Sequence, residues 1–394
     1  MRIDGAGLAV SASSRVLLLL PEAFSSAGGI QTYNRVAIRA FEDLAEGHAL
    51  QVTALLLKDR QSDIGCEYLG RPHCALLAFA GSRPRFVWAA LALAVRLQPQ
   101  LVVFGHANFA PLALGVRAVC PPAKQWFVAH GWEVWRRLNV LHRWAFRQAD
   151  SIFAVSEVTR RLLARHNGIA EERIALLPNA LDPAWDAHVS SRAALPTDPA
   201  RPVLLTVTRL VVGDKYKGVD QVLRALSIIA RDVPGVRYVV VGDGSDRSRL
   251  EGLARDLGVA CRVEFRGHLS TEELARAYAE CSLFLMPSPK EGFGIVFIEA
   301  ALFGKASIAA RQGGSAEVVE DGVTGRLVDP DDVAAIAVAA IELLSHPDRL
   351  RALGERARRV AERFTYEAFR RRLEGYVLAL TTPSVPGPGG TEGR

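Results

Sequence analysis

The sequence predicts an α/β protein built from two parallel-sheet domains that face each other across a central cleft. Three observations support this prediction. Short apolar runs rich in β-branched residues alternate with helical patterns along the whole chain, as βαβ units require. The 394 residues, 49% of them hydrophobic and 23% charged, are enough for two domains of ordinary size. Glycines and polar residues gather directly after the apolar runs, where parallel sheets bind ligands.

The predicted strands fall into two groups. The first group comprises residues 16–20, 51–57, 101–104, 125–129, 151–155 and 174–177. The second comprises residues 203–208, 237–241, 263–266, 283–286, 306–310 and 325–328. Helices are expected to begin near Ile30 and to cover residues 332–344 and 350–380.

Composition divides the chain between these two groups. Residues 182–202 are rich in proline and poor in large apolar side chains, which is typical of a linker. We therefore expect an N-terminal domain over 1–181 and a C-terminal domain over 203–357. A last helix, at about 358–380, is expected to cross back to the N-terminal domain. The Pro/Gly-rich tail 381–394 is expected to be disordered.

Composition also disfavours several classes of protein. The five cysteines are scattered, without a C-x-x-C pair, which argues against a metal site or a disulfide framework and fits a reducing cytoplasm. The apolar stretches are too short or too broken to span a bilayer. The patch at 16–20 lacks a cleavage pattern after it, so we interpret it as a strand rather than a signal peptide. We expect no nucleic-acid partner.

Positive charge is concentrated in the first half of the chain. Residues 1–195 carry 21 Lys/Arg and 15 Asp/Glu, whereas residues 196–394 carry 27 of each. Such an excess indicates an anionic partner or surface, or simply solvated arginines. The stretch 132–149 places tryptophan and leucine at helical spacing among arginines. A helix of this kind lies on an anionic membrane or packs on the sheet, and we expect the packing.

The stretch 289–304, PKEGFGIVFIEAALFG, joins a glycine loop to a segment that is apolar on every side. A helix that is apolar all round is buried, so Glu299 within it needs a hydrogen-bonding partner. Glu291 stands eight residues earlier, in the loop. The helix N-terminus lies between these carboxylates and offers free N–H groups, which suits a polar, partly anionic ligand.

Further candidate residues follow other predicted strands. Gly28 and Gly29 allow a backbone to approach a ligand closely, although an ordinary turn explains the pair equally well. The pair is not part of a G-x-G-x-x-G sequence, so a nicotinamide dinucleotide site is poorly supported. Arg209 with Lys217, or with Lys215, brackets a loop whose positive charges suit a diphosphate; the alternative is a solvated basic loop.

Two histidines also follow predicted strands. The neutral imidazole of His130 can exchange one hydrogen bond with a sugar hydroxyl or a glycosyl oxygen. His106 is placed similarly but has less supporting context, and a structural role explains either histidine as an alternative.

Together these motifs resemble the family 4 retaining glycosyltransferases. The segment EGFGIVFIE at 291–299 matches the E-x7-E motif of that family. The other matching segments are GGIQ at 28–31, VAHGWEVW at 128–135, AVSE at 154–157, LPNALD at 177–182, TRLVVGDKYKG at 208–218, VGDG at 241–244, FRGHLSTEEL at 265–274 and GGSAEVVEDGVTGRLVDP at 313–330. The resemblance extends over roughly residues 14–378 and is strongest to polysaccharide-assembling, mannosyltransferase-like members.

The resemblance implies the GT-B fold, in which two Rossmann-like domains face a central cleft. It implies transfer of a hexosyl unit from GDP-mannose or a UDP-sugar to a saccharide or lipid-linked saccharide in cell-surface polysaccharide biosynthesis. The donor would bind mainly to the C-terminal domain and the acceptor to the N-terminal domain. The enzyme would be cytoplasmic, with peripheral contact at the inner face of the plasma membrane. The alternatives are an inactive nucleotide-sugar-binding module and a GT-B sugar-nucleotide epimerase.

The resemblance also implies roles for individual residues. Arg209 and Lys217 would bind the donor diphosphate, with Lys215 able to replace Lys217 because the loop between them is longer than in many members. Glu299 would bind the ribose hydroxyls, and Glu291 would hold the donor sugar. The further implied donor contacts are Gly28, Gly29, Gly267, His268, Leu269, Gly292, Phe293, Gly294 and Ile295.

The implied catalytic residues are His130, Glu291, Arg209 and Lys217, with His106 on the acceptor side. His130 would lie near the C6 hydroxyl of the transferred sugar. The acceptor oxygen would attack from the side of the leaving phosphate, and charge on that phosphate would be stabilised by Arg209, Lys217 and the helix N-terminus. We expect no cofactor and no metal, because no D-x-D-type motif stands at a strand end. Gln31 departs from the glutamate of many members.

Overall fold

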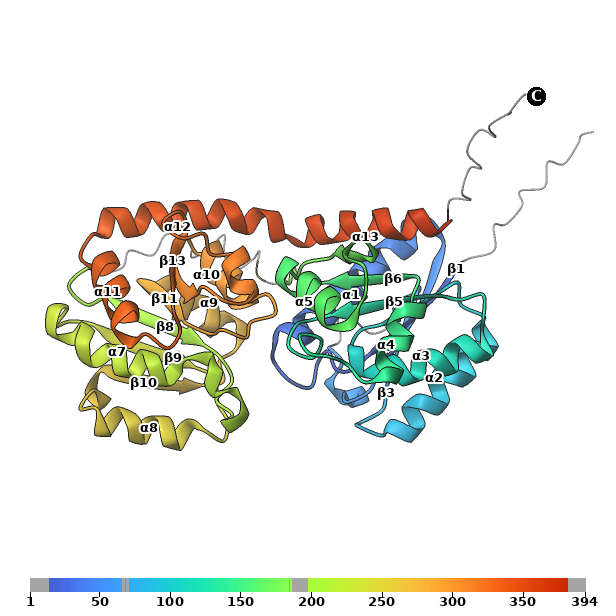
Figure 1. The fold of residues 1–394 in the computed structure, drawn as a ribbon, viewed down its shortest axis with the longest axis horizontal. Coiled ribbons are helices and arrows are strands. Elements are labelled where there is room, and N and C mark those ends of the chain that lie inside the picture. The colour runs from blue at the N-terminus through green and yellow to red at the C-terminus, as the bar shows by residue number, and fades with distance from the viewer. Residues whose placement is uncertain (1–13, 66–67, 69–70, 184, 186–197, 382–394) are drawn as a thin grey trace, which may run out of the picture.

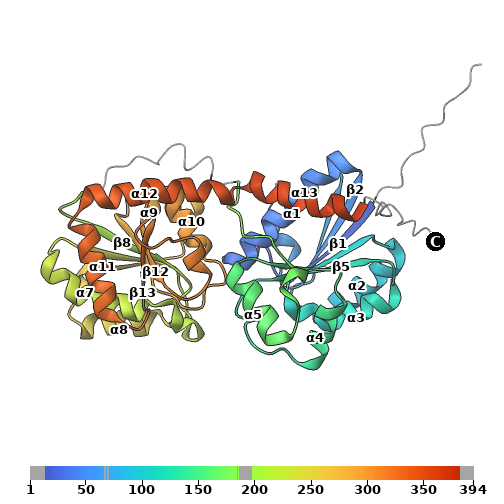
Figure 2. The same ribbon diagram turned by 45° about the horizontal axis from the view of Figure 1, so that its top comes forward.

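The computed structural model describes residues 14–65, 68, 71–183, 185 and 198–381. The chain forms two lobes, each built on a parallel sheet, with the C-terminal helices running along one side of both (Figure 1). Figure 2 shows the same arrangement from a second direction. Most of the expected linker 182–202 and nearly all of the expected tail 381–394 lie outside the described residues.

The first sheet has the strand order β3-β2-β1-β4-β5-β6-β7, and its neighbouring strands are parallel. Its strands are β1 (Ser14–Leu20), β2 (Leu50–Leu56), β3 (Cys74–Ala78), β4 (Leu101–Phe104), β5 (Lys124–Ala129), β6 (Ser151–Ala154) and β7 (Ile174–Leu176). The strands are apolar runs because helices cover both faces of a parallel sheet.

The second sheet has the order β10-β9-β8-β11-β12-β13 and is also parallel. Its strands are β8 (Val203–Val207), β9 (Arg237–Val241), β10 (Val263–Gly267), β11 (Leu283–Met286), β12 (Ser307–Ala310) and β13 (Gly325–Val328). Every strand predicted from the sequence is present, with ends that agree to within about two residues. The prediction missed β3, a short edge strand whose residues alternate between buried and partly or fully exposed.

The helices in the first half are α1 (Gly29–His48), α2 (Arg83–Leu97), α3 (Ala110–Val119), α4 (Val140–Gln148) and α5 (Glu157–Asn167). Those in the second half are α7 (Val219–Asp232), α8 (Arg247–Asp256), α9 (Thr271–Glu280), α10 (Ile295–Leu302), α11 (Val333–Leu344), α12 (Pro347–Ala361) and α13 (Tyr366–Thr381). The helical reading of 132–149 is wrong for its first part. Helix α4 begins only at Val140, because the Asn139 side chain caps it by accepting the N–H of His142.

The C-terminal helices join the two lobes. Helix α12 packs on α10, and α13 packs on α1. At the point where the chain passes between them, the N–H of Leu181 donates to the carbonyl of Phe364, at 3.0 Å. The ring of Phe364 packs against Phe293 in the second lobe, while Phe369 packs against Tyr33 in the first. One hydrophobic core therefore continues from lobe to lobe along this side.

On the cleft side, the contacts between the lobes include a carboxylate at a helix start, a cation–π contact and a backbone contact. The Glu317 carboxylate accepts the N–H groups of Glu157 and Val158, at 2.9 and 2.7 Å, at the start of α5. A carboxylate is favourable there because the first N–H groups of a helix lack partners within the helix. The Lys290 ammonium lies 4.2 Å from the ring centre of Trp132. In the third contact, a Cβ added at Gly292 would lie 1.8 Å from the carbonyl oxygen of His130, so the backbones touch.

The packing of α12 on α10 predicts unequal effects at two helical glycines. A Cβ at Gly354 would lie 1.9 Å from the carbonyl oxygen of Gly304, whereas a Cβ at Gly375 would meet nothing within 4 Å. We expect Gly354→Ala to lower the free energy of unfolding by about 1–3 kcal/mol through overpacking. The matched control Gly375→Ala should leave it unchanged or raise it by up to about 1 kcal/mol. Urea unfolding measures both; equal effects would contradict this account of the packing.

Candidate active site

A cavity of about 960 Å³ lies between the two lobes. Its walls include residues that follow β1, β2, β4 and β5 in the first sheet and β8 and β11 in the second. The strand order reverses between β1 and β4 and again between β8 and β11. Ligands of open parallel sheets bind at such reversals, beyond the carboxyl ends of the strands. The cavity therefore occupies the expected ligand position of both sheets at once.

Most of the site residues predicted from the sequence line this cavity. Those that do are Gly28, Gly29, His106, His130, Arg209, Lys217, Glu291, Gly292, Phe293, Gly294 and Ile295. Five others do not: Lys215, Gly267, His268, Leu269 and Glu299. Lys215 lies in the 3₁₀ segment Val212–Lys217, and the next three lie at and after the end of β10.

The two cations predicted to bind a diphosphate are paired with carboxylates. The Lys217 ammonium lies 2.6 Å from Oε1 of Glu291, and both side chains are largely buried. The Arg209 guanidinium lies 3.0 Å from Oδ2 of Asp214 and is more than half exposed. An incoming diphosphate competes for both cations, so its binding would release the Glu291 carboxylate toward the rest of the ligand.

Helix α10 begins at the floor of the cavity. Gly294 precedes it with φ of 86°, a left-handed conformation that glycine adopts without strain. No acidic side chain occupies the first turn of α10. The helix dipole and the first N–H groups therefore offer an anion a favourable position beside Lys217.

His130 is buried at the end of β5, and its hydrogen bonds define its tautomer. Its Nε2 lies 2.9 Å from the carbonyl oxygen of Gly105, and a carbonyl only accepts, so Nε2 carries the proton. Nδ1 is then a hydrogen-bond acceptor. Burial lowers the pKa of this imidazole to about 4, so the ring is neutral at physiological pH. The backbone N–H of His130 donates to Glu133, at 2.6 Å, which holds the loop in place.

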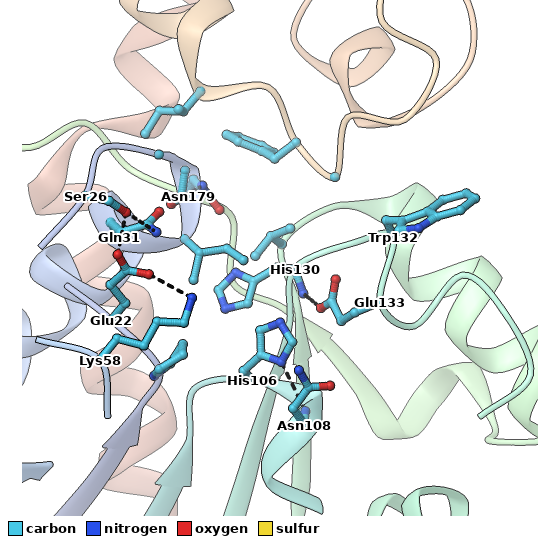
Figure 3. A pocket seen from close by; sticks show the side chains of 18 of the residues that line it. Glu22, Ser26, Gln31, Lys58, His106, Asn108, His130, Trp132, Glu133 and Asn179 are labelled. Carbon is cyan, nitrogen blue, oxygen red and sulfur yellow. Dashed lines mark hydrogen bonds and ion pairs between the residues drawn. The ribbon is translucent and has the colours of Figure 1, made fainter. Parts of the chain in front are cut away.

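His106 has the same tautomer but uses its other ring nitrogen within the protein. Its Nδ1 accepts the N–H of Asn108, at 3.1 Å, so in the neutral ring the proton is on Nε2. Burial also lowers the pKa of this imidazole. The two rings are stacked with centres 6.1 Å apart, and Figure 3 shows them side by side in the pocket. Together they offer a ligand one acceptor and one donor.

Glu299 lies against α9 rather than in the cavity. The hydroxyl of Tyr278 donates to its Oε2, at 2.8 Å, and this bond is the partner that a buried carboxyl requires. Burial nevertheless raises the pKa of Glu299 to about 7. Helix α10 is buried on all sides as the sequence predicts, and the partner of its one charged residue comes from a neighbouring helix.

Several residues of the cavity wall were not predicted as site residues. Glu22, Lys58 and Asn179 each follow a strand of the first sheet, while Lys290 and Trp132 form the cation–π contact between the lobes. The position directly after a strand was a signal for the first three. The contact between Lys290 and Trp132 joins residues far apart in the chain, so no local pattern indicates it.

Two findings bear on metals and membranes. Within the described part of the chain, no group of three or more His, Cys, Asp or Glu side chains is placed to hold a metal ion. In the same residues, no helix combines the length and the apolar character needed to cross a bilayer.

Models of known families match both lobes. The model described as Glycosyltransferase Family 4 matches residues 27–185, and the model described as Glycosyl transferases group 1 matches residues 190–360.

Curated relatives agree with this assignment. A GDP-mannose-dependent alpha-(1-6)-phosphatidylinositol monomannoside mannosyltransferase of Mycolicibacterium smegmatis is 38% identical over 275 residues, which cover 65% of this chain and 70% of the relative. A D-inositol 3-phosphate glycosyltransferase of Segniliparus rotundus is 32% identical over 247 residues, covering 59% of this chain and 54% of that relative.

Solved structures share the fold. A sucrose-phosphate synthase from Thermosynechococcus elongatus superposes with a TM-score of 0.78 at 23% identity, covering 93% of this chain and 99% of the other. Anabaena Alr3699/HepE in complex with UDP and glucose superposes with a TM-score of 0.74 at 19% identity, covering 93% and 100%. These neighbours establish the GT-B fold. The family models and the relatives together show that this chain belongs to glycosyltransferase family 4 and is a hexosyltransferase.

Proposed function

We propose that this enzyme transfers a hexosyl unit, with retention of configuration, from a nucleoside-diphosphate sugar to a saccharide or lipid-linked saccharide in cell-surface polysaccharide biosynthesis. The observation that carries the proposal is the division of the cavity. Arg209, Lys217 and the start of α10 form its cationic wall in the second lobe, whereas His106 and His130 form part of the opposite wall. GDP-mannose is the first donor to test, because a relative named for its dependence on GDP-mannose is 38% identical.

The proposed reaction proceeds on one face of the donor sugar. The bond between the anomeric carbon and the diphosphate oxygen breaks, and its electron pair stays on the diphosphate. The acceptor oxygen forms the new bond from the same face and gives its proton to the departing phosphate oxygen. Arg209, Lys217 and the α10 N-terminus stabilise the charge that develops on the diphosphate. Because this charge is largest in the transition state, they stabilise the transition state more than the ground state.

The cavity geometry also supports roles for the remaining residues. Glu291, once released by Lys217, accepts hydrogen bonds from hydroxyl groups of the donor sugar. Nδ1 of His130 accepts one more, because its Nε2–H is already used by Gly105. We further assign the acceptor to the domain 1–181 and the donor to the domain 203–357.

The nucleoside is proposed to extend from the cavity toward β10. Its base would then meet Gly267, His268 and Leu269, and its ribose would meet Glu299. Lys215 remains the alternative to Lys217 as the second diphosphate cation.

Peripheral membrane contact at the inner face of the plasma membrane is part of the proposal. Helix α3 contacts both α2 and α4, so these three form one surface of the first lobe. On it Trp88 is 73% exposed and Trp144 53%, together with exposed Val87, Val95, Val140 and Leu141. Exposed arginines accompany them, including Arg85 and Arg147. Tryptophan and arginine on one surface suit the interface of an anionic bilayer.

The first prediction concerns Glu291. Replacing it by glutamine removes the carboxylate that is proposed to hold the donor sugar. We therefore expect sugar transfer to fall by roughly 10- to 100-fold, the cost of a charge-assisted hydrogen bond. The change also removes the ion pair and leaves Lys217 unpaired. The affinity for GDP should stay the same or rise. Steady-state kinetics with GDP-mannose and calorimetric titration with GDP measure the two effects. The control Glu280→Gln removes an exposed ion pair with Arg276 on α9 and should change neither. Undiminished transfer by Glu291→Gln would refute the assigned role.

A second prediction separates the two nitrogens of His130. Glutamine can keep the donor bond to Gly105 but lacks the Nδ1 acceptor, whereas asparagine keeps an acceptor near Nδ1 and loses that donor. We expect His130→Gln to retain wild-type stability and to lose about tenfold or more in turnover. His130→Asn should instead unfold at a lower temperature than the wild type. Thermal unfolding and turnover assays distinguish these outcomes, and the reverse pattern would contradict the tautomer assigned here.

The lowered pKa of His130 also predicts a dependence of stability on pH. The unfolded chain binds a proton at this residue near 6.5, whereas the folded chain does so only near 4. Wild-type stability should therefore fall as the pH drops through this range, and His130→Gln should lack this component. Urea unfolding at several pH values tests the difference. If the free energy of unfolding changed with pH in the same way for both proteins, the burial of a neutral ring would be contradicted.

A further prediction concerns membrane contact. We expect the wild type to sediment with vesicles that contain anionic phosphatidylglycerol at low salt, and Trp88→Ser combined with Trp144→Ser to reduce the bound fraction several-fold. The control Val338→Ser removes a side chain that is 63% exposed on α11 of the other lobe and should not change binding. Absence of wild-type sedimentation at low salt would exclude this surface as a membrane contact.

A further inference from the structure

We propose that Glu22 and Lys58 form an acceptor subsite that binds adjacent hydroxyls of a polyhydroxylated ring, a sugar or a cyclitol. The inference rests on the proposed transferase function, since it assigns the acceptor end of the same cavity. Both residues line that cavity in the first lobe, and neither belongs to a motif of the sequence.

The two residues meet because their strands are neighbours. Glu22 follows β1 and Lys58 follows β2, which pairs with β1 in parallel. The N–H of Lys58 donates to the carbonyl of Pro21, at 3.0 Å, and extends the pairing beyond the strand ends. Nζ of Lys58 then lies 3.2 Å from Oε2 of Glu22. The pair thus stands at the carboxyl edge of the sheet, where open parallel sheets bind ligands.

The backbone N–H groups of the loop that follows Glu22 do not donate to the Glu22 carboxylate. That loop is held instead by Asp59, whose buried carboxylate accepts the N–H groups of Ala23, Phe24 and Ser25, at 2.9, 2.6 and 2.7 Å. The Glu22 side chain meets only other side chains among the described contacts, namely the hydroxyls of Ser25 and Ser26 and the Lys58 ammonium.

The charge states of the pair are defined by these contacts. Burial would raise the pKa of Glu22, but hydrogen bonds from Ser26 and Lys58 outweigh it and keep this pKa below its ordinary value. Glu22 is therefore a carboxylate at neutral pH. Its side chain is 9% exposed, while that of Lys58 is 62% exposed, so the ammonium stands nearer to solvent than the carboxylate.

The chemistry of the pair selects hydroxyl groups. One carboxylate oxygen already accepts two serine hydroxyls, which is the contact that sugar hydroxyls would make. Lys58 donates, and so does the Nε2–H of His106, whose pKa is affected by the Lys58 charge. A ring hydroxyl both donates and accepts, so neighbouring hydroxyls can satisfy the carboxylate and the ammonium together. An acceptor with a single hydroxyl on an apolar body cannot do so.

The subsite faces the reacting end of the donor. Figure 3 shows Glu22 and Lys58 on one side of His130 and His106, in the same pocket. His130 is assigned to the donor sugar, so a ring held by Glu22 lies beside that sugar. Glu22 is thus a positioning residue: it orients the ring and leaves the transfer chemistry to the diphosphate.

The test compares binding of two probes, myo-inositol and methyl α-D-mannopyranoside, to the full chain saturated with GDP. Saturation-transfer NMR titrations give their affinities, and the stronger probe shows whether the ring is a cyclitol or a sugar. We expect Glu22→Gln to lower the affinity for the probe by about 10- to 100-fold. Lys58→Gln should lower it by less, because loss of a charged acceptor costs more than loss of one exposed donor. GDP affinity and the thermal midpoint should stay at wild-type values.

The matched control is Lys124→Gln. Lys124 is also about half exposed and pairs with Asp150 at 3.0 Å, but it begins β5 and so lies at the amino ends of the strands, away from the cavity. The Lys124→Gln variant should bind both the probe and GDP with wild-type affinity. Failure of the wild type to bind either probe, or wild-type affinity in Glu22→Gln, would overturn the subsite. Parallel loss of GDP affinity and stability in Glu22→Gln would reassign the residue to support of the fold.

The outcome is separable from that of the proposed function. If the wild type binds a probe but never consumes GDP-mannose or UDP-glucose, the transferase proposal fails and the subsite stands. If it transfers sugar and Glu22→Gln does so with an unchanged acceptor KM, the subsite fails alone.

Discussion

The backbone contact between Gly292 and the His130–Gly131 segment is the constraint on which the site depends. A single Cβ at Gly292 would lie 1.8 Å from the His130 carbonyl oxygen, and one at Gly131 would lie 2.7 Å from Cα of Gly292. Only glycine permits this approach without displacement of the backbone. The contact sets the width of the cleft at the point where the candidate catalytic residues of both lobes meet. It therefore brings His130 and Glu291 to one cavity although they are 161 positions apart.

Several charges around the cavity are paired before any ligand arrives. Lys217 is paired with Glu291, Arg209 with Asp214, and Lys58 with Glu22. The two cavity histidines are held neutral by burial. The Lys217–Glu291 pair and the Glu22 carboxylate are largely buried, and a buried charge is costly unless it is paired. Pairing therefore keeps these groups charged inside the cavity. A substrate that carries its own anions and hydroxyls can replace the internal partners one for one, which is the basis of binding in our proposal.

Strand-end placement proved the most informative signal in the sequence. It brought forward Arg209, Glu291, His106 and His130, which all line the cavity, because parallel strands share one carboxyl edge. The same signal was present at Glu22 and was overlooked, since no motif surrounds it. The expected helix over 132–149 was wrong before Val140, because helical spacing cannot reveal a loop held from elsewhere. Here the Asn167 side chain accepts the N–H of Leu138 and binds the carbonyls of Val134 and Arg136.

The sequence by itself determined all the described strands except β3, the parallel α/β class, the buried nature of α10 and, through its motifs, the family. These properties depend on local periodicity and on the apolar character of short segments, which tertiary structure does not reverse. Only the tertiary structure decided which side chains pair. Lys217 with Glu291, Tyr278 with Glu299 and Lys58 with Glu22 are contacts between segments that are distant in sequence. Their identity depends on strand order and on how the helices and loops pack within each lobe, and no local pattern of residues encodes either one.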